Sequence, residues 1–225
     1  MPTAEVLDVT APPERPKPAF RGVSHEIAAL AMVVVGPILG LSARGVLAEL
    51  CCAVYAFCLT AMLSVSALFH RVTWSTPARR RMRRLDHSTI FLAIAGTYTA
   101  IAGLALPGAD RVIVVSMVWA GAVGGIVLRL VWLDAPKWAV ALPYLALGWV
   151  AAAIVPELLH STGGVGLTLL ITGGAFYTLG AVVYAKKRPD PWPSTFGYHE
   201  IFHACVIVAL TLHFCLVAFV ILPRH

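Results

Sequence analysis

Seven long apolar runs dominate the sequence and lie near residues 27–42, 48–70, 87–106, 112–132, 138–156, 163–185 and 198–222. Each run approaches the roughly 20 helical residues that are needed to cross the hydrocarbon of a membrane. Hydrophobic residues make up 59% of the chain and charged residues only 12%, whereas soluble domains carry roughly 25% charged residues. This composition excludes secreted, disordered and nucleic-acid-binding proteins. The sequence predicts an all-α integral membrane protein with seven transmembrane helices.

Lys and Arg residues fall mainly on one side of this predicted topology. They are Arg15, Lys17, Arg21, Arg71, Arg79, Arg80, Arg81, Arg83, Arg84, Arg129, Lys137, Lys186, Lys187 and Arg188. The segments on the other side carry only Arg44, Arg111 and Arg224. Because basic residues favour the cytoplasmic side, the N-terminus is predicted to be cytoplasmic and the C-terminus outside. We therefore expect a multi-pass protein of a bacterial inner or plasma membrane.

The segments outside the apolar runs are short and polar. Residues 1–23 are rich in proline and mixed charges, so we expect a disordered cytoplasmic tail there and a seven-helix domain over 24–225. The largest expected loop, 71–86, is rich in arginine and would suit anionic lipid headgroups. All five cysteines lie in apolar runs, where we expect them to serve as packing residues.

Histidines and one aspartate interrupt the apolar runs, where an ionisable side chain is costly unless it is paired, hydrated or functional. The run that ends at His70, the run that follows Asp86 and the last run, which begins near His199, meet at the cytoplasmic face of the predicted topology. His199 and His203 are four residues apart and share one helix face, a spacing from which both imidazoles can bind one metal ion. The sequence therefore predicts a metal site at this depth.

His70 is the candidate for a third ligand, and three histidines with an open position for water are typical of a catalytic zinc ion. Asp86 would be a fourth ligand, or it would hold and deprotonate a zinc-bound water, which is acidic enough to supply hydroxide at neutral pH. Ser66, one helical turn before His70, would orient a ligand or contact a substrate carbonyl.

The segment from His199 to His203 also matches H-E-x-x-H, in which Glu200 would be the general base of a metalloprotease. This pattern lies in the last apolar run with its candidate partner Asp86 far upstream, which argues against a protease. We assign structural roles to the other polar residues. His213, about 15 Å further along the last helix, should bond a neighbouring helix; the others, expected at the interface or between helices, are His25, Glu26, His87, Thr97 and Tyr98.

Three ordered blocks resemble the signature of the hemolysin III family. They are S-A-L-F-H at 66–70, L-D-H-S-T-I-F at 85–91 followed by A-G-T-Y-T at 95–99, and F-G-Y-H-E-I-F-H at 196–203. That family is the bacterial branch of the progestin and adipoQ receptor group, which includes the adiponectin receptors. The resemblance covers about residues 21–222.

The resemblance implies a seven-helix protein with a cytoplasmic N-terminus and a zinc ion near the cytoplasmic face. By motif, the zinc ligands would be His70, His199 and His203, with Asp86 holding the zinc-bound water and Ser66 nearby. The wider superfamily includes alkaline ceramidases and implies hydrolysis of lipid amides or esters.

The sequence thus predicts a zinc-dependent hydrolase of a lipid-like amide or ester, in which Zn²⁺ polarises the carbonyl and Asp86 activates the water. Its expected partners are membrane lipids and a lipid-like substrate. Two alternatives stay open: a membrane-disrupting, pore-forming hemolysin, for which the chain offers no soluble delivery form, and a non-catalytic lipid sensor with a structural zinc ion. The ligand set would also accept other late first-row metals.

Overall fold

The apolar runs of the sequence are helical, because in hydrocarbon a helix satisfies every backbone N–H and C=O within its own segment. The computed structural model describes residues 17–132 and 136–225. Its helices are α1 (Val23–Ser42), α2 (Val46–Arg71), α3 (Thr76–Ala105), α4 (Gly108–Val131), α5 (Lys137–Gly148), the 3-10 turn η1 (Trp149–Ile154), α6 (Val155–Lys186), α7 (Tyr198–Cys215) and its extensions η2 (Leu216–Ile221) and η3 (Leu222–Arg224). The described ranges contain no strand, which confirms the predicted all-α class.

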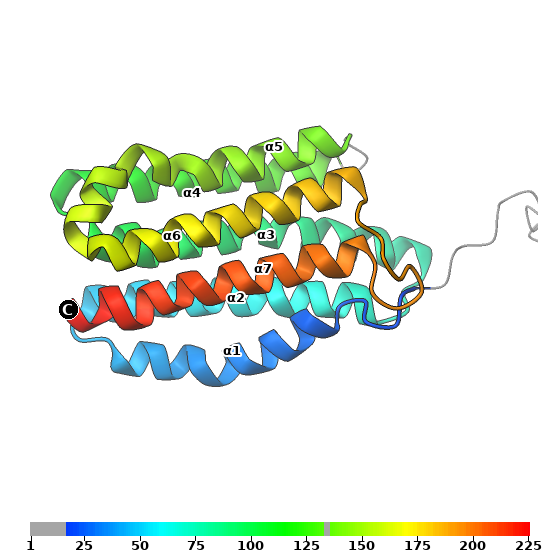
Figure 1. The fold of residues 1–225 in the computed structure, drawn as a ribbon, viewed down its shortest axis with the longest axis horizontal. Helices are drawn as coiled ribbons and strands as arrows, with labels where there is room; N and C mark the ends of the chain where they lie inside the picture. Colours follow the sequence, from blue (N-terminus) through cyan, green and yellow to red (C-terminus); the bar gives the residue numbers. More distant parts are fainter. Residues whose placement is uncertain (1–16, 133–135) are drawn as a thin grey trace, which may run out of the picture.

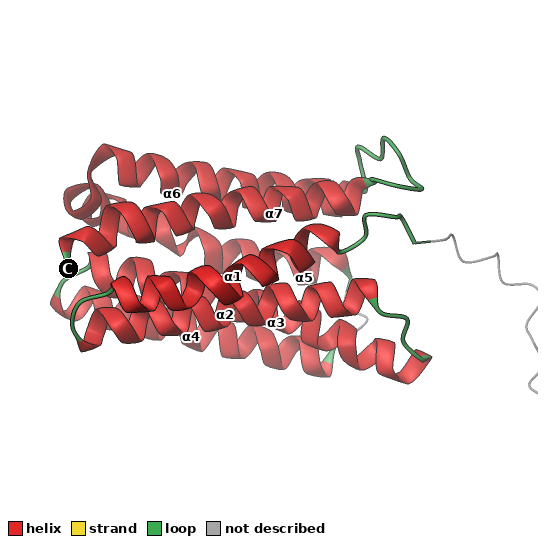
Figure 2. Cartoon of the chain, turned by 90° about the horizontal axis from the view of Figure 1, so that it is seen from below, coloured by secondary structure: helices red, strands yellow, loops and turns green. Residues whose placement is uncertain are grey.

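The helices run lengthwise in one bundle (Figure 1). The contacts between them join α1 to α2, α2 to α3, α3 to α4 and α6 to α7, and α1 also touches α7. Figure 2, turned by 90°, shows the same lengthwise packing with the loops gathered at the two ends. At one of these ends α1, α3 and α7 begin and α2 ends, while the C-terminus lies at the opposite end. We call the former the site end, because it holds the residues that the sequence predicts for the metal site.

Six helical stretches among the described residues are long and apolar enough to cross a membrane. One of them covers 45 residues, Leu142–Lys186. A continuous helix of that length would measure about 68 Å, roughly twice the thickness of bilayer hydrocarbon. The chain turns over η1 and a kink at Gly163 instead, so that α5 and most of α6 lie side by side (Figure 1).

The predicted loop over 71–86 is wrong for most of its length. Helix α3 begins at Thr76 with Pro77 in its first turn, and the arginines up to residue 84 are helical. Arginine is a good helix former and proline suits the first turn, so the charge that ends the apolar run does not end the helix. Asp86 consequently lies inside α3 rather than at its start.

Small side chains let the central helices approach closely. A Cβ atom added at Gly103 of α3 would lie 3.1 Å from the sulfur of Cys51 in α2. Four of the five cysteines are buried, and the described residues form no disulfide.

Large apolar side chains such as Leu41 and Phe57 point outward, 88% and 68% exposed. An outer surface of this kind suits contact with lipid.

Residues 17–22, which the sequence analysis placed in the disordered tail, pack against the loop between α6 and α7. The backbone N–H groups of Ala19 and Phe20 donate to the carbonyls of Ser194 and Thr195, each at 3.1 Å. Residues 1–16, including Arg15, lie outside the described part of the chain. The ordered segment leads directly into α1 at the site end.

Candidate metal centre

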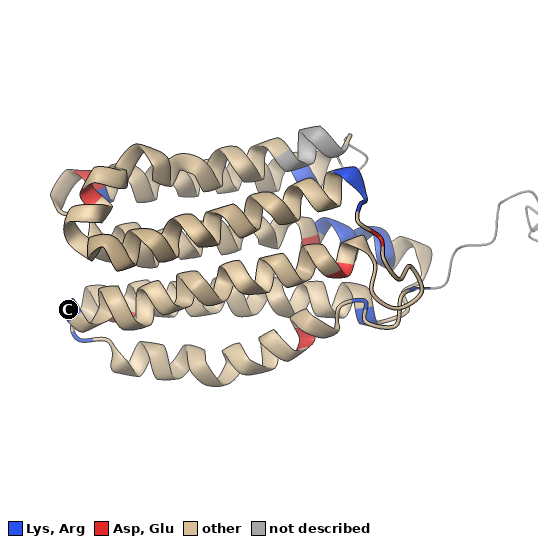
Figure 3. Cartoon of the chain, viewed as in Figure 1, with Lys and Arg blue, Asp and Glu red and all other residues tan. Residues whose placement is uncertain are grey.

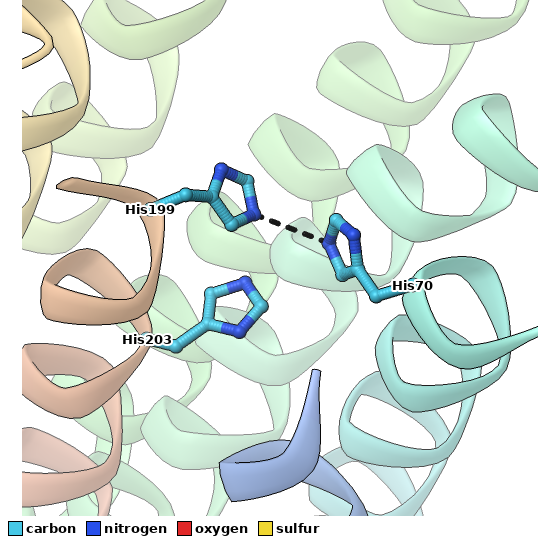
Figure 4. Close-up of side chains that lie close together, drawn as sticks. All are labelled: His70, His199 and His203. Atoms are coloured by element: carbon cyan, nitrogen blue, oxygen red, sulfur yellow. Dashed lines mark hydrogen bonds between the residues drawn. The ribbon is translucent and has the colours of Figure 1, made fainter. Parts of the chain in front are cut away.

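Two helices present three imidazoles to one another at the site end (Figure 4). His70 lies in the last turn of α2, and His199 and His203 lie in the first two turns of α7. Their ligand nitrogens all lie within 4.8 Å of one another. The Nε2 atoms of His70 and His199 are 3.2 Å apart. The structure therefore brings together the three predicted metal ligands.

The spacing of these nitrogens fits a small metal ion. In a tetrahedral site with Zn–N bonds of 2.0–2.1 Å, two ligand nitrogens lie about 3.4 Å apart. The pair from His70 and His199 is already close to that value, and His203 needs only a small shift. His203 is buried, and its Nδ1 has no hydrogen-bond partner among the described residues. A neutral imidazole set of this kind can hold Zn²⁺ or another late first-row ion.

Glu200 fixes the start of α7 and so the position of the two α7 histidines. Its Oε2 accepts a hydrogen bond from the backbone N–H of Gly197 at 2.8 Å, and its Oε1 forms an ion pair with Arg21. The side chain is only 3% exposed. Both carboxylate oxygens are thus engaged in structural contacts, which argues against Glu200 as the general base of an H-E-x-x-H protease.

Ser66 and Asp86, the two predicted catalytic residues, are buried beside the histidines. Ser66 lies one turn before His70 on α2, and its side chain is a neighbour of the Asp86 carboxyl group on α3. Asp86 lines the same pocket as His70 and His199. The five predicted residues therefore come from three helices to one place, and their catalytic roles stay predictions.

A fourth histidine, which sequence reasoning placed at the membrane interface, belongs to this cluster. His25, in the first turn of α1, is 3% exposed. Its ring stacks on that of His203 with centroids 3.9 Å apart and planes 7° from parallel, and its Nδ1 lies 2.9 Å from the hydroxyl oxygen of Ser66. The available signal was its position at the start of the first apolar run, at the depth of the other histidines. Glu26, by contrast, pairs with Arg71 on the exposed surface.

A glycine allows α1 to begin so close to the metal site. Gly22 has φ +82, a backbone conformation that side chains rarely adopt. A Cβ atom at this position would lie 2.7 Å from the Cβ of His70. The left-handed turn therefore lets the chain pass the end of α2 and places His25 against the α7 histidines.

The other polar residues have structural partners. His213 lies with its Nε2 3.2 Å from the carbonyl of Leu170 on α6, which confirms the expected bond to a neighbouring helix. The Tyr98 hydroxyl donates to a backbone carbonyl at the end of α5 at 2.8 Å, as expected for a bond between helices, whereas the Thr97 hydroxyl donates to the Ala93 carbonyl within α3. The guanidinium of Arg129, buried in α4, lies 2.8 Å from the Nδ1 of His87.

A pocket of about 310 Å³ opens beside the histidines. Its walls combine metal-site residues, two aromatic rings and a set of basic side chains. The lining residues are Lys17, Arg21, Phe69, His70, Arg79, Arg83, Asp86, His87, Tyr184 and His199. Its volume is in the range of small-molecule sites, about 300–1,000 Å³.

Comparison with known proteins places the chain in a family. The haemolysin-III-related family matches residues 14–214, a range that includes the whole histidine cluster. The chain is 32% identical over 139 residues to Hemolysin-3 of Bacillus cereus, a match that covers 62% of this chain and 61% of the relative. It is also 32% identical over 142 residues to the Hemolysin-3 homolog of Bacillus subtilis (strain 168), with 63% of each chain covered.

A human protein, monocyte to macrophage differentiation factor, is 26% identical over 165 residues, which are 72% of this chain and 66% of the relative. The chain spans somewhat less than two thirds of the length of the Bacillus relatives. The family match nevertheless covers most of the chain and confirms the resemblance on which the site was predicted. The protein therefore belongs to the haemolysin-III-related family and is a multi-pass membrane protein.

Proposed function

We propose that this protein is a zinc-dependent membrane hydrolase that cleaves a lipid-like amide or ester at the site end of the bundle. The observation that carries the proposal is the convergence of three imidazoles from two helices next to a buried carboxylate that lines the same pocket. Three histidine ligands leave one position open for water, as catalytic rather than structural zinc sites do. The apolar outer surface suits the membrane from which a lipid substrate would come.

Each residue of the cluster has a role in the proposed mechanism. His70, His199 and His203 would hold the ion, which when bound acidifies a water molecule and polarises a carbonyl group. Asp86 accepts one proton from the attacking water and returns it to the departing amine or alcohol as the carbonyl carbon–heteroatom bond breaks. Ser66, a neighbour of Asp86, would donate its hydroxyl hydrogen to the carboxylate and so orient it.

The pocket lining supports a substrate with an anionic headgroup. Lys17 and Arg79 are held in place at the pocket: the Lys17 ammonium donates to the carbonyl of Val72 at 3.3 Å, and the Arg79 guanidinium lies 5.9 Å from the centre of the Phe69 ring. Arg83 completes the basic wall. Each basic side chain near a membrane surface attracts anionic lipid by about 1 kcal/mol. The proposed substrate is therefore an acylated lipid that carries phosphate or carboxylate.

The proposed topology has seven spans, with α5 and α6 as separate crossings, the N-terminus in the cytoplasm and the C-terminus outside. Figure 3 supports it, because Lys and Arg gather at the site end, with few at the opposite end. Cysteines introduced as Lys187→Cys and Arg224→Cys test the orientation. In intact cells a membrane-impermeant thiol reagent should label only the second, and labelling of only the first would reverse the topology.

The test of the proposed function is metal content, measured by mass spectrometry on protein prepared without chelator or nickel resin. We expect about one zinc ion per chain in the wild type, none in His203→Ala, and wild-type content in His213→Ala, which changes a buried histidine of the same helix outside the cluster. The wild type and His213→Ala should then release fatty acid from a panel of lipid amides and esters. Absence of metal from the wild type, or full turnover by His203→Ala, would overturn the proposal.

Membrane disruption is a second candidate, because two of the relatives carry the name Hemolysin-3. Leakage of liposomes by the wild type and equally by His203→Ala would support a pore that does not depend on metal. The third candidate is a lipid sensor in which a structural ion links α2 to α7. A large loss of thermal stability on chelation without hydrolysis of any lipid would favour it.

A further inference from the structure

The first turn of α1 supplies a side chain that touches both halves of the proposed site but holds no metal. His25 contacts His203, a candidate metal ligand, through its ring face and Ser66, the neighbour of the Asp86 carboxyl group, through its Nδ1. Its own nitrogens are not part of the ligand group formed by the other three histidines. His25 therefore lies behind the site rather than in it.

The stack replaces a contact that metal-binding histidines usually make. Such a histidine commonly donates its second ring N–H to a carboxylate or carbonyl, which fixes the orientation of the ring. The Nδ1 of His203 has no such acceptor within residues 17–132 and 136–225. Instead, the ring of His25 stacks on the ring of His203, with centroids 3.9 Å apart and planes 7° from parallel. This contact restricts rotation of the His203 ring and keeps its other nitrogen turned toward His70 and His199 (Figure 4).

The hydrogen bond of His25 also has a defined direction. The Nε2 of His25 has no acceptor in the described structure, so the ring proton belongs on Nδ1, which donates it to the Ser66 hydroxyl oxygen. The Ser66 hydroxyl hydrogen is then available for donation to the neighbouring Asp86 carboxyl group. This arrangement leaves the Nε2 of His25 without a proton, and Nε2 is the buried nitrogen for which the described structure offers no partner.

From these contacts we propose that His25 is a positioning residue with two separable functions: its ring orients the metal ligand His203, and its Nδ1–H orients Asp86 through Ser66. The orientation of Asp86 through Ser66 rests on the proposed hydrolase function, whereas the orientation of His203 requires only that the site binds metal. Gly22 lets the start of α1 pass close to α2, and the Arg21–Glu200 ion pair joins it to α7, so the position of His25 is built into the fold.

Two substitutions separate the two functions. His25→Phe keeps a flat ring for the stack but removes the donor to Ser66, whereas His25→Asn keeps an N–H donor near the position of Nδ1 but removes the ring. We expect His25→Asn to lower zinc affinity by about 10- to 100-fold, measured by competition with a chelator, and His25→Phe to leave it within a factor of about three. With zinc saturating, we expect His25→Phe to lower kcat by about 10- to 100-fold and His25→Asn to lower it less.

Two further variants keep the proposal falsifiable. Ser66→Ala removes the same hydrogen bond without changing α1, and it should reproduce the kcat loss of His25→Phe, with no further loss in the double variant. His213→Asn removes a buried ring from the same bundle outside the cluster and should leave zinc affinity unchanged.

Wild-type zinc affinity in a folded His25→Asn variant would overturn the role of the ring. Additive kcat losses of Ser66→Ala and His25→Phe would overturn the role of the hydrogen bond. If the wild type binds zinc but cleaves no lipid, the proposed function fails, while the zinc affinities of the two His25 variants still decide the role of the ring.

Discussion

The two halves of α7 each bury a histidine, and the two residues differ in what surrounds them. His203 lies among rings from α1, α2 and its own helix, and its Nδ1 has no hydrogen-bond partner in the described chain. His213, about three turns further along, lies against the carbonyl of Leu170 in a gap left open by Gly173. A single buried histidine can thus be a helix-packing residue. Convergence of several histidines from different helices is what distinguishes a candidate site.

The first test of this contrast is the response of protein stability to chelation. Binding of an ion to the folded state alone stabilises it by about 2.7 kcal/mol at a concentration 100 times the dissociation constant. Removing zinc with a chelator should therefore lower the melting temperature of the wild type and of His213→Ala, but not of His203→Ala. The contrast between the two histidines fails if His203→Ala responds to the chelator as the wild type does.

The second contrast is between the two buried carboxylates near the histidines. Asp86 lines the pocket, whereas both oxygens of Glu200 bond to Gly197 and Arg21. We expect Asp86→Asn to retain zinc but to lower kcat by about 10²- to 10⁴-fold, the usual contribution of a general base. Glu200→Gln can still accept from the Gly197 N–H, so it should lower kcat far less than Asp86→Asn does, and it should lower stability because Arg21 loses its ion-pair partner. If Glu200→Gln lowered kcat far more than Asp86→Asn, Glu200 would be the general base, as the protease interpretation requires.

The third contrast compares two glycines near the ends of α1. An alanine at position 22 must adopt a positive φ and fit against the Cβ of His70, whereas Gly40 has no other atom within 4 Å of an added Cβ. Gly22→Ala should lower the free energy of unfolding by about 1–3 kcal/mol, the usual cost of such a strained residue, and should weaken zinc binding because His25 shifts. Gly40→Ala should raise the free energy of unfolding by up to about 1 kcal/mol, since alanine favours the helix. Equal stability of the two variants would contradict the close approach of α1 to α2.

Helix geometry explains which parts of the site the sequence could predict. The spacing of His199 and His203 fixes their common face, and the depths of His70 and Asp86 follow from where apolar runs begin and end. These relations depend on single helices and on the membrane boundary, both of which periodicity and hydropathy report. The sequence therefore predicts the depth and the helix face of these residues, and the resemblance to the family supports their grouping into one site.

What the sequence could not predict depends on contacts between helices. The stack of His25 on His203 requires α1 to begin against α7, which depends on the left-handed turn at Gly22 and on the Arg21–Glu200 pair. The length of α3 was missed for a different reason. Hydropathy reports the apolar part of a helix, and the arginine-rich first turns of α3 are helical but polar.

The smallest expected effect concerns the basic wall of the pocket. Arg79 and Arg83 line it, whereas Arg81, on the same helix, is exposed and is not among the lining residues. All three arginines carry the same charge at the same end of the bundle. If they served only to set the topology, substituting any of them would have the same effect. For a lipid substrate with a phosphate headgroup, Arg79→Gln and Arg83→Gln should each raise KM by about fivefold, which corresponds to about 1 kcal/mol per charge, and Arg81→Gln should not. The same variants should leave KM unchanged for an uncharged lipid amide. An equal effect of all three substitutions would reduce the basic wall to general attraction between the protein and the membrane surface.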